Sequence, residues 1–83
     1  MFYVYVLQSD KDSNQIYYGQ TADLKKRFSE HNAGLNKSTR RYIPWKIVYY
    51  EAYVSRSQAL AREKQLKHYG QARSALKKRL NLI

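Results

Sequence analysis

Residues 17–32, Tyr-Tyr-Gly-Gln-Thr-Ala-Asp-Leu-Lys-Lys-Arg-Phe-Ser-Glu-His-Asn, are the stretch around which this chain is organised. They predict the end of a strand, a turn, and then a helix. Thr21 is the expected N-cap of that helix, and Asp23 in its first turn favours the helix dipole. Gly34 is expected to stop the helix, because glycine readily adopts the left-handed conformation at a helix end.

Apolar residues in this helix recur with the 3.6-residue period and form a stripe that we expect to face a core. They are Leu24, Phe28 and Leu35. Arg27 and His31 lie four residues apart, so they share a face at the edge of the stripe. With an upstream tyrosine they could handle a phosphodiester. The simpler interpretation, a basic amphipathic helix whose Arg and His merely border the core, is preferred from this stretch alone.

The charge of the chain predicts a polyanionic partner. Among 83 residues, 16 Lys and Arg face 6 Asp and Glu, for a formal net charge of +10. Nucleic acid is the first candidate and an anionic membrane surface the second, although no stretch predicts a membrane-lying helix. The nine tyrosines also suit nucleic acid, but Tyr is common in strands too.

Length and composition favour one small domain in a reducing compartment. The chain has no cysteine, which removes disulfides and thiolate metal sites. No run is long and apolar enough to span a membrane, and the N-terminal run lacks the basic flank of a signal peptide. We therefore expect a cytoplasmic protein without membrane contact.

Three strands are predicted, over residues 2–7, 16–19 and 46–53. The first is apolar on both alternating sets, so it belongs in the centre of a sheet. The turn residues of 10–14 join it to the second strand as an antiparallel hairpin. Gly19 ends the second strand, where a small residue permits a tight turn or close approach of a ligand.

Two helices are predicted in the C-terminal part. Ser55 and Gln58 form a capping box that begins a helix running to about Tyr69. Gly70 is the expected stop of that helix. A last helix is expected from about Ala72.

Basic side chains gather in two segments that we expect to contact phosphates. The first is the loop of residues 35–44, and the second is the polar face of the last helix, opposite Leu76 and Leu80. The candidates are Lys37, Arg40, Arg41, Lys77 and Lys78. The alternative for each is a solvated surface charge.

Glu63 is the most informative residue of the second predicted helix. It falls inside the apolar arc that Ala59, Leu60 and Leu66 define. A carboxylate aimed at a core is costly unless it is paired or metal-bound. An ion pair with Lys67 and a Mg²⁺ ligand are equally good explanations from spacing alone.

Short motifs recur in a definite order along the chain. They are Tyr3-Val4-Tyr5, Tyr17-Tyr18-Gly19, Arg27, His31-Asn32 and Glu63. In this order they resemble the GIY-YIG endonuclease domain over essentially the whole chain. The chain looks most like small stand-alone bacterial members, which continue with a basic loop, Pro-Trp-Lys and Tyr-Tyr-Glu, here residues 37–41, 44–46 and 49–51.

The resemblance implies an α/β fold of the α+β type, a small three-stranded antiparallel sheet flanked by helices. It implies cleavage of a phosphodiester bond with one divalent ion, Mg²⁺ or Mn²⁺, held by Glu63. Arg27 would stabilise the phosphorus, and Tyr5 or Tyr17 would take a proton from water, helped by His31. We expect Arg27 and the ion to lower the pKa of the reacting tyrosine below its ordinary value of ~10.

The chain departs from the family pattern at several positions. Tyr3 and Tyr18 replace the Gly and Ile of the family name, at positions that serve packing and backbone. Gln20 stands where some members, such as the excinuclease subunit of nucleotide excision repair, carry a Lys. This leaves His31 as the expected helper of the tyrosine.

The expected function is a metal-dependent endonuclease acting on DNA rather than RNA, with a structure-specific or repair-related role among the expectations. A non-catalytic nucleic-acid-binding module with the same fold is the alternative. An interaction protein with a Tyr-rich docking sheet is a third, weaker one. No added reader domain is recognisable, so specificity would come from this surface, from homo-oligomerisation or from a protein partner.

Overall fold

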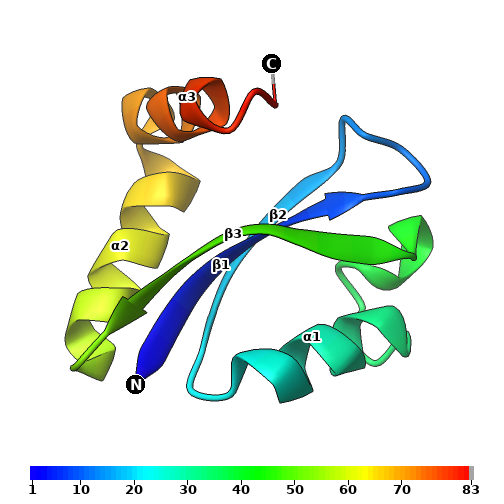
Figure 1. Ribbon diagram of the computed structural model, residues 1–83, viewed down its shortest axis with the longest axis horizontal. Helices are drawn as coiled ribbons and strands as arrows, with labels where there is room; N and C mark the ends of the chain where they lie inside the picture. Colours follow the sequence, from blue (N-terminus) through cyan, green and yellow to red (C-terminus); the bar gives the residue numbers. More distant parts are fainter. Residues whose placement is uncertain (83) are drawn as a thin grey trace.

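A three-stranded antiparallel sheet with helices on both faces forms the protein, which a computed structural model describes over residues 1–82 (Figure 1). The strands are β1 (Phe2–Ser9), β2 (Ile16–Thr21) and β3 (Trp45–Tyr53). The helices are α1 (Leu24–Asn32), the short 3-10 helix η1 (Arg40–Tyr42), α2 (Arg56–His68) and α3 (Gly70–Arg79). The strand order β2-β1-β3 places β1 in the centre, so the predicted architecture is confirmed.

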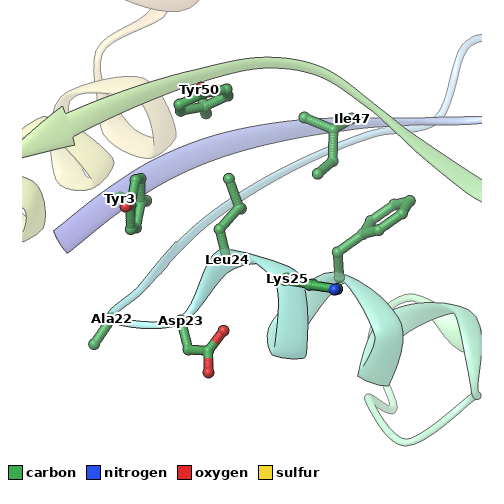
Figure 2. A pocket seen from close by; sticks show the side chains of 8 residues that line it. Tyr3, Ala22, Asp23, Leu24, Lys25, Ile47 and Tyr50 are labelled. Carbon is green, nitrogen blue, oxygen red and sulfur yellow. The ribbon is translucent and has the colours of Figure 1, made fainter. Parts of the chain in front are cut away.

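The side of the sheet that α1 covers has its own apolar core, which we call the α1 core. Tyr5, Leu7 and Trp45 are its buried members. Leu24 from α1 and Ile47 from β3 pack against them, and Figure 2 shows both side chains between the helix and the sheet. This core holds α1 against the sheet.

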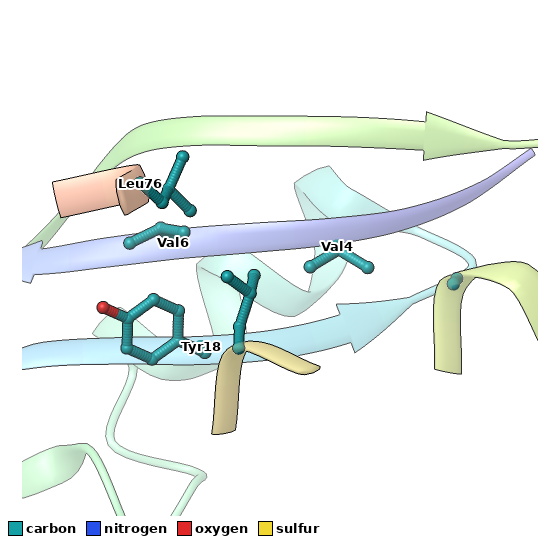
Figure 3. Close-up of a cluster of buried hydrophobic side chains, with 6 residues drawn as sticks. Val4, Val6, Tyr18 and Leu76 are labelled. Carbon is teal, nitrogen blue, oxygen red and sulfur yellow. The ribbon is translucent and has the colours of Figure 1, made fainter. Parts of the chain in front are cut away.

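The opposite side of the sheet carries a second core, the α2/α3 core, which Figure 3 shows from close by. Its buried members are Val4, Val6, Tyr18, Ala59, Leu66 and Leu76. Successive residues of β1 point to opposite faces, so one strand supplies both cores. Four consecutive β1 residues, positions 4–7, are each at most 1% exposed, as its doubly apolar pattern predicts.

The beginning of α1 differs from the prediction. Asp23, not Thr21, is the N-cap: its carboxylate accepts a hydrogen bond from the backbone N–H of Lys26 at 3.0 Å. Thr21 hydroxyl instead accepts from the backbone N–H of Asp23 at 3.1 Å, which completes a turn before the helix. The predicted stop near Gly34 is confirmed, with φ at 79°. Leu35 therefore lies beyond the helix and is 73% exposed, so its place in the apolar stripe was wrong.

The capping box of α2 is confirmed. The Ser55 hydroxyl accepts a hydrogen bond from the backbone N–H of Gln58, and the Gln58 side-chain oxygen accepts one from the backbone N–H of Ser55. The apolar face of α2 is narrower than predicted. Ala59 and Leu66 are fully buried, but Leu60 is 42% exposed. The helix therefore touches the sheet along a thin line and leaves its flanks free for polar side chains.

The boundary between α2 and α3 also differs from the prediction. Tyr69, with φ −112° and ψ 106°, breaks the helix, and Gly70 begins α3 instead of only ending α2. The chain turns here so that Leu76 can pack on the sheet. No helix within residues 1–82 combines the length and apolar character needed to cross a membrane.

Candidate active site

A buried hydrogen-bonded chain connects Tyr5 to the loop that precedes β3. The Tyr5 hydroxyl lies 2.8 Å from Nε2 of His31, and Nδ1 of His31 lies 2.7 Å from the Thr39 hydroxyl. His31 was expected at the edge of the apolar stripe, but it is fully buried. Burial is tolerated because both ring nitrogens have partners.

The pKa values of Tyr5 and His31 determine the protonation state of these hydrogen-bonded side chains. Burial, assisted by the nearby Arg27 charge, lowers the pKa of His31 to about 4. Burial and the Tyr17 hydroxyl raise the pKa of Tyr5 to about 12, although Arg27 opposes this. Arg27 lowers the pKa of Tyr5, as expected, but the effect of burial is larger. The Thr39 hydroxyl donates to the Asn36 carbonyl at 3.5 Å, so its oxygen accepts from Nδ1–H of the neutral His31, and Tyr5 donates to Nε2.

Tyr17 lies beside this pair on the same side of the sheet. Its ring centroid is 4.9 Å from that of His31 and 6.3 Å from that of Tyr5. Tyr5 is paired with Gly19 and Tyr17 with Leu7, so the two tyrosines are diagonal neighbours on adjacent strands. Both tyrosines therefore project to the same side of the sheet.

Arg27 reaches the same cluster from α1. Its guanidinium lies 3.2 Å from the carboxylate of Glu30, one turn along the helix. Its charge acts on the pKa values of both Tyr5 and His31, which places it next to their hydrogen bond. Its side chain is 34% exposed, so a planar cation faces the surface beside two phenols.

Glu63 and Lys67 approach the cluster from α2. Their side chains form an ion pair with Nζ–Oε2 at 3.6 Å, which is the first of the two explanations that spacing left open. Lys67 Nζ also lies 5.7 Å from the centre of the Tyr17 ring. The Glu63 charge in turn raises the pKa of Tyr5, so the carboxylate belongs to the same electrostatic neighbourhood.

The orientation of α2 is fixed by an ion pair next to Glu63. Arg62 donates from Nε to Glu51 of β3 at 3.0 Å and from a terminal nitrogen at 3.1 Å. The hydroxyls of Tyr49 and Tyr53 donate to the same carboxylate. Consecutive residues of a helix point in directions about 100° apart, so Glu63 does not share the direction in which Arg62 contacts β3.

The carboxylates present set the kind of metal that would fit. Within residues 1–82, no group of three or more His, Cys, Asp or Glu side chains is close enough to hold an ion. Glu63 alone fits Mg²⁺ or Mn²⁺, which bind through one carboxylate and keep waters and substrate phosphate as other ligands. Its side chain is 23% exposed and pairs with the flexible Lys67, so it is accessible to such an ion.

The GIY-YIG catalytic domain profile matches residues 1–81. The chain belongs to the GIY-YIG family. This is a family of nuclease type, so the substrate class of its catalytic domain is nucleic acid.

Curated relatives of this GIY-YIG chain are UPF0213 proteins. One from Haloquadratum walsbyi is 41% identical over 68 residues, which are 81% of this chain and 74% of that protein. Another, from Streptococcus pyogenes serotype M5, is 44% identical over 63 residues, which are 74% of this chain and 65% of that protein. The match thus spans slightly less than two thirds of the streptococcal protein. No solved structure matches the chain significantly.

The basic residues singled out in this GIY-YIG chain lie in two separate places. Those on the loop before β3 are exposed, and neighbouring Tyr42 and Ile43 pack into the α1 core, on the side of the tyrosine cluster. They are Lys37, Arg40 and Arg41. Lys77 and Lys78 lie on α3, whose Leu76 packs into the core of the opposite face.

Sequence reasoning missed Thr39, the far end of the buried chain. It lies in the loop that we expected to contact phosphates, but its side chain is fully buried. Its carbonyl accepts from the indole N–H of Trp45 at 2.8 Å, which locks the loop onto β3. Position 39 carries no motif of its own, because its role depends on a contact with His31 eight residues away.

Proposed function

We propose that the protein is a metal-dependent DNA endonuclease that hydrolyses phosphodiester bonds. The observation that carries this proposal is the convergence of five side chains from four elements, β1, β2, α1 and α2. They are Tyr5, Tyr17, Arg27, His31 and Glu63. A module that only binds nucleic acid needs surface cations. It has no need of a buried phenol–imidazole pair beside a carboxylate.

Glu63 is the residue that would hold the ion, Mg²⁺ or Mn²⁺. When bound, such an ion supplies positive charge to the phosphate and to the leaving oxygen. Lys67 holds the Glu63 carboxylate in place through the 3.6 Å ion pair. A long, flexible ammonium side chain can swing away from this position without disturbing the helix.

We assign proton acceptance from the attacking water to the Tyr17 oxygen. The Tyr5 hydroxyl is buried and engaged with His31, and its pKa of about 12 keeps it protonated. Tyr17 is only half-buried and lies against the same imidazole. Tyr5 and His31 then act together as a rigid polar support beneath the reacting phenol.

Arg27 is assigned to the non-bridging oxygens of the scissile phosphate, because a planar guanidinium matches them with two parallel donors. Its ion pair with Glu30 limits the side-chain freedom lost on binding. The exposed cations Lys37, Arg40 and Arg41 are assigned to flanking phosphates on the same side. Lys77 and Lys78 would take part only where DNA passes the opposite face of the sheet.

Cleavage assays with a Glu63→Gln variant test this proposal. Purified protein should nick plasmid DNA with Mg²⁺ or Mn²⁺ and stop in EDTA. Glu63→Gln should remove nicking while DNA binding and the unfolding midpoint stay close to wild type. Asp10→Asn, which neutralises an exposed carboxylate paired with Lys46 away from the cluster, is the matched control. Nicking that survives EDTA or Glu63→Gln would refute the metal role, and binding without nicking would favour the non-catalytic module.

A further inference from the structure

An aromatic groove on the α1 side of the sheet has no part in the proposed chemistry (Figure 2). Tyr3 of β1 and Tyr50 of β3 form one wall, with ring centroids 6.0 Å apart and an interplanar angle of 64°. Leu24 of α1 faces them across a space of about 500 Å³. Tyr50 is 55% exposed, so a large aromatic surface is open to solvent.

The register of the sheet places this groove next to the reacting cluster. Tyr50 is paired directly with Tyr5, which sets their Cα atoms about 5 Å apart. The Tyr5 ring leans the other way, over Gly19 of β2. The groove and the cluster therefore lie on one face, on the two sides of Tyr5.

The charges around the groove suit a nucleic-acid strand. Lys25 lies at the groove, and the chain carries a formal net charge of +10. Asp23 also lies there, but its carboxylate accepts from the backbone N–H of Lys26 at the start of α1. Figure 2 shows the Asp23 carboxylate pointing away from Tyr50. Aromatic walls with a cation at the rim are how proteins hold unpaired bases.

We propose that this groove binds an unpaired nucleobase of the DNA strand that is cleaved. A base inside an intact duplex must first leave its stack and its partner base, which costs free energy. The preferred substrate is therefore DNA with a single-stranded segment, such as a flap or a free single strand. This inference rests on the proposed function, because the strand in the groove is the one whose phosphodiester would lie at the cluster.

Binding measurements in EDTA test the groove without cleavage. The probes are a single-stranded oligonucleotide carrying one 2-aminopurine and the same oligonucleotide annealed into a full duplex. Wild-type protein should bind the single strand more tightly and quench its 2-aminopurine. Tyr50→Leu keeps an apolar side chain but removes the stacking ring, so it should weaken single-strand binding about tenfold and abolish the quenching. Tyr69→Leu, at a tyrosine that is 59% exposed outside the groove, should change neither.

Equal single-strand binding by Tyr50→Leu and Tyr69→Leu would overturn the inference and leave the groove to an apolar protein partner. Equal wild-type affinity for the single strand and the duplex would overturn it as well. The proposed hydrolysis fails separately, if no cleavage follows when Mg²⁺ or Mn²⁺ is added. A quenched, Tyr50-dependent complex that is never cut would keep the groove and reject the endonuclease.

Discussion

The phenol ring of Tyr5 lies directly on the backbone of Gly19, in the neighbouring strand. A Cβ atom at position 19 would overlap Cζ and the hydroxyl oxygen of Tyr5. The missing side chain of Gly19 is thus the space in which the Tyr5 hydroxyl reaches His31. The glycine of the second motif and the last tyrosine of the first motif form one structural unit.

Gly19→Ala should therefore displace the Tyr5 ring. Overpacking a buried site typically costs about 1–3 kcal/mol, and we expect the free energy of unfolding to fall by that order. Cleavage activity should fall as well, because the Tyr5 ring is displaced. Urea unfolding and plasmid nicking measure the two effects. Gly70→Ala is the control, because a Cβ at the start of α3 meets no atom within 4 Å. An activity of Gly19→Ala equal to that of Gly70→Ala would contradict the close contact.

His31 should make the stability of the protein depend on pH. Its pKa falls from 6.5 to about 4 on folding, so the unfolded chain binds a proton more readily than the native one. The stabilisation is complete above pH 6.5 and is lost as the pH falls towards 4, by about 3 kcal/mol in total. Urea unfolding at several pH values across this range measures it.

Histidine variants isolate this effect from other acid-sensitive groups. The contribution of Glu51 to the stability of the protein is also lost at low pH. Burial alone would raise the pKa of this carboxyl, but hydrogen bonds from Arg62 and two tyrosines outweigh burial and hold the pKa below its ordinary value. His31→Gln should flatten the pH dependence between 6.5 and 4, and only the Glu51 part should remain. His68→Gln, at an exposed position, should behave like wild type. An unchanged slope in His31→Gln would reject the buried neutral imidazole.

The two tyrosines should differ when each is changed to phenylalanine. Tyr17→Phe removes the proposed proton acceptor but keeps the ring against His31, so it should fold, bind DNA and fail to cut. Tyr5→Phe removes a donor to His31 and should retain partial cleavage with lower stability. Single-turnover cleavage at saturating protein separates the two. The reverse order of activities would make Tyr5 the base.

Arg27 and Arg40 should separate catalysis from binding. Arg27→Ala should lower the cleavage rate by on the order of 10²-fold, as lost transition-state charge stabilisation does, and should cost little affinity. Arg40→Ala should instead weaken binding and reduce the log–log salt slope by roughly 0.9, while cleavage of bound DNA continues. Binding titrations at several salt concentrations and single-turnover rates measure both. Parallel loss of binding and cleavage in Arg27→Ala would favour the non-catalytic module.

The sequence by itself determined the elements and their order, because these depend on local periodicity and capping. Alternating apolar residues in 2–7 predicted a central strand, and a capping box predicted the start of α2. The motif tyrosines, Arg27, His31 and Glu63 were identified from their order along the chain. Local signals predicted the ends of the elements less accurately: the N-cap of α1 is Asp23, and the prediction was Thr21.

Only the tertiary structure decided how the site residues meet and in which protonation state. Tyr5 and His31 are 26 residues apart, and their hydrogen bond exists because α1 packs across β1. Thr39 is part of the buried hydrogen-bonded chain because the hydrogen bond from Trp45 holds its loop in place. The pKa of Tyr5 is raised for the same reason, because the burial that outweighs the Arg27 charge is a property of the packed fold.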